Sequence, residues 1–145
     1  MRQMVVAITL LLSLALIGCV GEKKPSIEGT WRLVSGWQKT GDITGKYSQT
    51  DYHGIKMICG GHWAILGRSV RDKDTLDNYG GGTYTLEGNN YTESIEYFVV
   101  KSSIGNVVPF EVEVRNDTLI QKGPRKIGKY QDSQWELYEV WARMK

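Results

Sequence analysis

Short runs that alternate between apolar and polar residues recur along the chain from residue 30 onward. Clusters of Gly, Asn and Asp separate these runs, and none of them has the periodicity of an amphipathic helix. The pattern therefore predicts an all-β domain. Its eight expected strands cover residues 30–37, 54–59, 62–67, 83–86, 90–100, 107–114, 118–121 and 134–143.

Three tight turns indicate how these strands follow one another. Gly60-Gly61 fits a two-residue hairpin loop, because glycine adopts a positive φ without steric cost, and Gly88-Asn89 and Asn116-Asp117 are consistent with similar turns. Each turn links consecutive strands, so neighbours in sequence become neighbours in space. Eight such strands close most simply into an antiparallel up-and-down β-barrel, which leaves no exposed sheet edge.

The turn positions also predict which side chains share a face. The turn at 88–89 pairs Leu86 with Tyr91 and places Glu93 among aromatic side chains on one face. A buried carboxylate is costly unless it is paired or hydrogen-bonded. We therefore expect either a partner for Glu93 across the barrel or a register that differs by one residue.

The connection over residues 68–82, "RSVRDKDTLDNYGGG", differs from the other turns. Its charges are mixed in sign and it ends in three glycines. Long loops without secondary structure in small domains are often lids or binding loops. The sequence predicts such a loop here, with a solvated surface loop as the alternative.

Residues 1–18 stand apart from the folded domain. The apolar run over 4–17 is shorter than the ~20 residues of a membrane-spanning helix and is typical of a signal-peptide core. Leu16-Ile17-Gly18-Cys19 resembles a bacterial lipobox, which implies cleavage before Cys19 and a diacylglycerol on its thiol. An uncleaved anchor or an ordinary secretory signal is the alternative. Residues 19–26 would then be the lipidated cysteine and a short tether, and 27–145 the barrel domain.

Charge and cysteine content narrow the possible partners. Cleavage before Cys19 would leave 17 basic and 16 acidic residues, and this near-neutral balance argues against a nucleic-acid partner. Cys59 would be the one remaining thiol, so the domain must be stabilised by burial and not by a disulfide. We expect a monomer anchored to a membrane outside the cytoplasm. Val20 in place of Asp, by resemblance to bacterial sorting rules, favours the outer membrane if the source has two membranes.

The first and last strands carry a further signal. They are neighbours in a closed barrel, so Trp31 and Arg143 can stack, a contact worth on the order of 1–2 kcal/mol when desolvated. Gly29-x-Trp31 with a terminal Arg143 resembles the signature of the lipocalin or calycin superfamily. "GTWRLVSG", "YGGGTYTLEGNNYTESIEY" and "WELYEVWARMK" resemble bacterial lipocalin-like domains of unknown function, many of them on lipoproteins. The resemblance implies that Gly29, Trp31 and Arg143 form the structural floor of the barrel.

The resemblance also implies a cavity in the barrel mouth for a small hydrophobic or amphipathic molecule. An eight-stranded barrel has room either for its own side chains or for one small ligand. The alternative is therefore a filled barrel that acts as an interaction or scaffold lipoprotein, through residues 68–82 or an outer face. The candidate ligand-binding residues are Trp37, Trp63, Tyr84, Tyr97, Phe110 and Trp141, with Glu93 as a polar anchor.

An enzymatic function has weak support. Cys59 and His62 flank the turn at 60–61 and would form a cross-strand pair, close enough for the imidazole to activate the thiol. A nucleophile also needs an orienting group and an oxyanion site, and the sequence indicates neither. His53, Cys59 and His62 lack the usual spacing of metal ligands. We therefore expect no catalytic residues, no metal and no cofactor.

Overall fold

The computed structural model describes residues 26–71 and 74–145, with side chains at all of these positions except 70, 71 and 74–76. The expected signal peptide, Cys19 and nearly all of the tether lie outside the described residues. Two short 3-10 helices, η2 (Lys101–Ser103) and η3 (Gly128–Tyr130), lie in connections between strands. The strands in the described part are β1 (Gly29–Thr40), β2 (Ile43–Ser48), β3 (Tyr52–Cys59), β4 (His62–Arg71), β5 (Asp74–Glu87), β6 (Asn90–Phe98), β7 (Val107–Arg115), β8 (Thr118–Gly123) and β9 (Trp135–Arg143).

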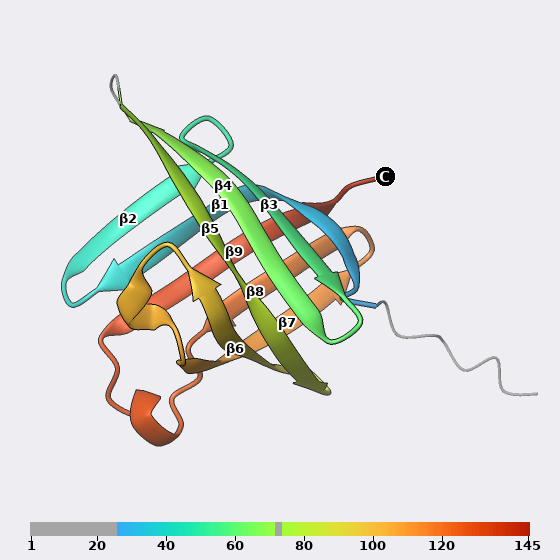
Figure 1. Cartoon of the computed structure of the whole chain (residues 1–145), viewed down its shortest axis with the longest axis vertical. Helices are drawn as coiled ribbons and strands as arrows, with labels where there is room; N and C mark the ends of the chain where they lie inside the picture. Colours follow the sequence, from blue (N-terminus) through green and yellow to red (C-terminus); the bar gives the residue numbers. More distant parts are fainter. Residues whose placement is uncertain (1–25, 72–73) are drawn as a thin grey trace, which may run out of the picture.

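The strands form a closed antiparallel barrel (Figure 1). Strands β3 to β9 pair in sequence order, β1 pairs with β3, and β9 pairs back with β1, which closes a ring of eight strands. The predicted all-β, eight-stranded up-and-down barrel is confirmed. Strand β2 is an addition to this ring. It pairs with the second half of β1 over residues 35–40, beyond the part of β1 that pairs with β3.

The prediction of a structureless loop at residues 68–82 is wrong. Strands β4 and β5 pair continuously from His62 opposite Thr83 to Arg71 opposite Asp74, and the two strands run on past the rest of the barrel (Figure 1). Arg68 and Asp77 face each other on this arm and form an ion pair of 2.6 Å. Opposite charges across a strand pair favour this pairing. The apolar alternation fades here, which is why the pattern did not indicate strands.

The three predicted turns are all present. Cys59 pairs with His62, which leaves Gly60-Gly61 as a two-residue loop with φ values of 56° and 80°. The turn at 88–89 follows the same plan and pairs Leu86 with Tyr91 as predicted. The turn at 116–117 joins β7 to β8 and pairs Arg115 with Thr118. These turns carry the register from strand to strand and so determine which side chains face inward.

Two β-bulges reverse the alternation of side chains within a strand. In β1 the register with β9 shifts between Leu33 and Ser35, so Val34 is the extra residue. In β6, Gly82 of β5 pairs with Ile95 and Gly81 pairs with Tyr97, so Glu96 is the extra residue. Because side chains in a strand alternate with a period of two, every residue beyond each bulge changes face.

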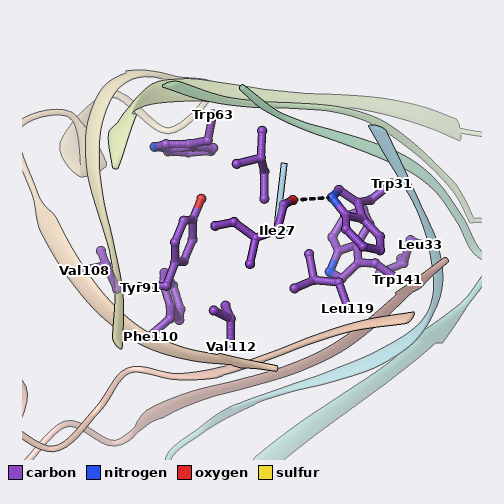
Figure 2. Packing of buried hydrophobic residues seen from close by; sticks show 11 residues of the cluster. Ile27, Trp31, Leu33, Trp63, Tyr91, Val108, Phe110, Val112, Leu119 and Trp141 are labelled. Carbon is purple, nitrogen blue, oxygen red and sulfur yellow. Dashed lines mark hydrogen bonds between the residues drawn. The ribbon is translucent and has the colours of Figure 1, made fainter. Parts of the chain in front are cut away.

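The barrel core is built mainly from aromatic and branched side chains (Figure 2). The inward faces of β7 and β8 are part of it. The buried apolar residues are Ile27, Trp31, Leu33, Ile58, Trp63, Tyr91, Val108, Phe110, Val112, Leu119 and Trp141.

One end of the barrel is closed by the predicted pair of Trp31 and Arg143. The Arg143 guanidinium carbon lies 4.1 Å from the centre of the Trp31 ring, and the guanidinium donates to the carbonyl oxygens of Ser26 and Glu28 at 2.8 and 2.7 Å. Gly29 has a φ of 140°, and a Cβ there would lie 2.6 Å from Arg143 Nη1. The glycine is therefore needed for this floor to close.

Candidate functional site

A charged pair lies inside the barrel above this floor. Lys56 and Glu93 are 3% and 5% exposed, and their charged groups are 2.6 Å apart. The Lys56 ammonium also donates to Gln121 Oε1 at 2.5 Å. Glu93 thus has the partner across the barrel that its burial requires, and the predicted register is correct.

Three aromatic rings surround the same ammonium. Lys56 Nζ lies 5.4, 5.6 and 6.0 Å from the ring centres of Tyr91, Trp63 and Trp141. At such distances a desolvated cation is attracted to the ring faces. The Tyr91 hydroxyl points toward the Trp63 ring (Figure 2). Neither this hydroxyl nor Trp63 Nε1 has a hydrogen-bond partner among the described residues. These contacts fill the middle of the barrel.

Glu139 marks the boundary between this filled region and the open end. It projects inward from β9, and its two oxygens accept hydrogen bonds from the Tyr47 hydroxyl at 2.9 Å and from Trp141 Nε1 at 3.2 Å. Burial raises the pKa of Glu139, and Glu93 adds to the rise, whereas Lys56 and the two hydrogen bonds oppose it. The Tyr47 pKa is also raised, first by burial and then by the Glu139 charge.

A small pocket opens at this end, opposite the Trp31 floor. We call it the mouth pocket, and its volume is about 170 Å³. Its walls come from β1, β2, β3, β4, β5 and β9, and from the connection before β3. The lining residues are Gln38, Tyr47, Asp51, Tyr52, Ile65, Ser69, Asn78 and Glu139.

Glycines hold the two tyrosines of the mouth pocket against the barrel wall. A Cβ on Gly36 would lie 2.7 Å from the Tyr47 ring, and a Cβ on Gly54 would lie 2.7 Å from the Tyr52 ring. A Cβ on Gly67 would collide with the Tyr52 hydroxyl. The Tyr47 and Tyr52 rings meet edge to face with centres 6.2 Å apart. Because these glycines have no side chain, the two tyrosine rings can lie flat along the barrel wall.

The candidate ligand-binding residues divide into four groups, three of which lie inside the barrel or at its floor end. Trp63, Phe110 and Trp141 are buried in the core. Tyr84 is half-buried at the floor end, where it packs on Tyr91 and its hydroxyl donates to Glu28 at 3.3 Å. Glu93 is paired with Lys56, as described above. None of these five lines the mouth pocket, so their proposed contact with a ligand stays a prediction.

The expected inward placement of Trp37 and Tyr97 is wrong. Trp37 stacks on Tyr138 on the outer face, with ring centres 6.0 Å apart, and Tyr97 is 68% exposed. Each residue follows a bulge, Val34 in β1 and Glu96 in β6, and simple alternation therefore assigns it to the wrong face.

The sequence interpretation missed Lys56 and most of the mouth pocket. A signal for Lys56 was present: the turn at 60–61 pairs Ile58 with Trp63, and Lys56 shares the face of Ile58. Tyr47 belongs to β2, which has no apolar alternation. Ser69 and Asn78 lie in the stretch that was predicted to be a loop.

Cys59 and His62 lie at the tip of the hairpin that joins β3 and β4. The two residues are cross-strand partners at an exposed hairpin tip, and His62 Nδ1 lies 3.1 Å from the Gly60 carbonyl oxygen. Within residues 26–71 and 74–145, no group of three or more His, Cys, Asp or Glu residues is placed to hold a metal ion. No helix in that part of the chain is long and apolar enough to cross a membrane.

A second hollow lies on the outer face of β1, β3, β4 and β5. Its volume is about 720 Å³, and its outward-facing wall combines apolar and basic side chains. Leu66 and Tyr79 are 55% and 51% exposed there. The lining of this outer groove includes the basic residues Arg32, His53 and Arg68 and the acidic residue Asp77, which is paired with Arg68.

Comparison with known protein families, with curated proteins and with solved structures found no match for this chain.

Proposed function

We propose that this protein is a lipid-anchored, lipocalin-like barrel that binds one small amphipathic molecule in its mouth pocket. The observation that carries the proposal is the contrast between the two ends of the barrel. The floor is filled by Trp31 and Arg143, and the middle by Lys56 with its polar and aromatic partners. The mouth is open and is lined by two tyrosines, polar groups and Ile65. The tyrosine rings and Ile65 give the pocket apolar surface, and its other lining side chains are polar. Convergent polar groups beside apolar surface are typical of small-molecule sites.

The pocket volume limits the size of the ligand. Sites for drug-sized molecules usually span about 300–1,000 Å³, and the mouth pocket is about 170 Å³. A long acyl chain would need the space that the aromatic core occupies. The proposed ligand is therefore a small molecule, with a short apolar part against Ile65 and a polar part near Glu139.

Membrane attachment through Cys19 is the second element of the proposal, and it rests on the lipobox resemblance alone. It would hold the barrel at a membrane outside the cytoplasm, the outer membrane in a source with two. Metabolic labelling with a fatty acid should mark the wild-type protein and leave Cys19→Ser unlabelled. Unlabelled wild-type protein would refute the anchor without affecting the ligand site.

A screen of small molecules by saturation-transfer NMR tests ligand binding. Hits that bind in the mouth pocket should lose their signal with Ser69→Phe, which places a large ring in the pocket wall. Ser102→Phe, on the exposed helix η2, is the matched control and should leave the hits unchanged. Hits that persist equally in both variants would contradict a site in the mouth.

The outer groove supports a second candidate function, that of an interaction protein. Its apolar residues Leu66 and Tyr79 are exposed in a wall that also holds Arg32, whereas Arg68 is paired with Asp77. An exposed apolar patch of this kind suits a protein partner. A crosslinked partner that is lost with Leu66→Asp but kept with Leu86→Asp, together with an empty mouth pocket, would favour this function.

A further inference from the structure

We propose that the mouth pocket selects a small molecule that carries a cationic amine, held by the Glu139 carboxylate and the rings of Tyr47 and Tyr52. This inference rests on the proposed function, because it names the ligand class of the same pocket. Three independent features of the pocket support it: its charge, its hydrogen-bonding groups and its aromatic walls.

The charges inside the barrel leave one carboxylate without a cationic partner. Lys56 is paired with Glu93 at 2.6 Å. Among the described side chains, none forms an ion pair with Glu139. Asp51 adds a second carboxylate to the pocket wall. A cationic group bound here would balance charge that is otherwise held in a poorly solvated site.

The hydrogen-bonding groups of the pocket favour a ligand that donates. Each Glu139 oxygen accepts one hydrogen bond and keeps capacity for another. Asn78 donates to the Tyr52 hydroxyl at 3.1 Å, while its Oδ1 is buried and has no partner among the described residues. An ammonium group has three donors and no acceptor, which matches these free acceptors.

The tyrosines supply the third feature. A cation over an aromatic face gains about 0.5–2 kcal/mol, depending on its exposure. Tyr47 and Tyr52 lie beside Glu139 and Asn78, so a carboxylate, an amide oxygen and two rings converge on one small space. The barrel already holds one ammonium with the same combination of groups: Lys56 lies between Glu93, Gln121 and three aromatic rings.

Three probes with one apolar stem and different head groups test this inference: n-butylamine, n-butanol and butyrate. They are titrated against the full-length protein in a non-ionic detergent, and Kd is measured from NMR shifts of the protein. We expect the amine to bind at least tenfold more tightly than the alcohol or the acid. Glu139→Gln should reduce this preference to less than threefold. Glu111→Gln, which changes a glutamate on the outer surface, should keep it.

The outcomes separate this inference from the proposed function. If butanol or butyrate binds as tightly as the amine and Ser69→Phe abolishes that binding, the pocket is a ligand site but not an amine site. If no probe binds, or binding is insensitive to Ser69→Phe, both proposals fail. If Glu139→Gln does not fold, Asp51→Asn at the exposed rim gives the second test, with an expected threefold or greater loss of amine affinity. An unchanged affinity would overturn the inference.

Discussion

At the scale of single residues, the central feature is an ammonium group buried in the middle of a β-barrel. Lys56 is compensated by the Glu93 carboxylate, the Gln121 amide and three aromatic rings. The need of Glu93 for a partner was predictable from its place among apolar residues. The identity of that partner was not, because β3 and β6 are separated by two strands and no turn fixes their relation.

Removal of Lys56 alone should be strongly destabilising. Lys56→Met leaves Glu93 as an unpaired buried charge, and we expect a loss of about 3–5 kcal/mol in the free energy of unfolding, measured by urea denaturation. The double variant Lys56→Met with Glu93→Leu removes both charges and should recover more than half of that loss. If the double variant loses as much free energy of unfolding as Lys56→Met, or more, then Glu93 is not destabilising when it is left without Lys56, and this interpretation is wrong.

At the scale of strands, the two bulges decide which residues reach the interior. Turn residues indicated the strand order and much of the register, because glycine and asparagine are required where φ is positive. The bulge at Val34 has no comparable signal in the sequence, and the glycines opposite the bulge at Glu96 were interpreted as the end of a loop. Trp37 and Tyr97 were therefore assigned to the wrong face. Trp63 was placed correctly, because the register of β4 with both of its neighbours has no shift.

The bulge in β6 depends on a close backbone approach that only glycine permits. A Cβ on Gly82 would collide with the Ser94 carbonyl oxygen. We therefore expect Gly82→Ala to destabilise the protein by about 3 kcal/mol or more, as judged by urea denaturation. A Cβ on Gly45 in β2 would have only the Gln38 carbonyl oxygen nearby, at 4.0 Å, so Gly45→Ala is the matched control. Similar losses for the two variants would argue against this role of the bulge.

At the scale of the whole molecule, barrel closure was predictable and the shape of the interior was not. The meander and the pairing of Trp31 with Arg143 follow from turns and from the chain ends. The open mouth lies where the Tyr47 and Tyr52 rings pack on Gly36, Gly54 and Gly67 of β1, β3 and β4. In these contacts a tyrosine ring occupies the space that a larger side chain would fill at the glycine position. The alternation of apolar and polar residues along a strand does not reveal such contacts.

The open mouth should also make the stability of the ligand-free protein depend on pH through Glu139. Its pKa is raised in the folded state, so its contribution to stability is complete below about pH 4.3, the ordinary glutamate pKa. That contribution is lost as pH rises through the folded-state pKa. Glu139→Gln should therefore gain stability relative to wild type as pH rises.

Urea denaturation of both proteins from pH 4 to pH 8 measures this difference. Ser102→Ala on the exposed helix η2 is the control, because it changes no titratable group, and its difference from wild type should be nearly constant. A difference between wild type and Glu139→Gln that does not change with pH would contradict the raised pKa.

The most direct test of a ligand site in the mouth pocket is native mass spectrometry of the protein purified gently from its own host, beside a denatured sample. We expect an additional small mass that disappears on denaturation and is absent from Ser69→Phe prepared in the same way. A bare protein mass in both samples, with no shift when small amines or other small amphipathic molecules are added, would contradict a ligand site in the mouth of the barrel.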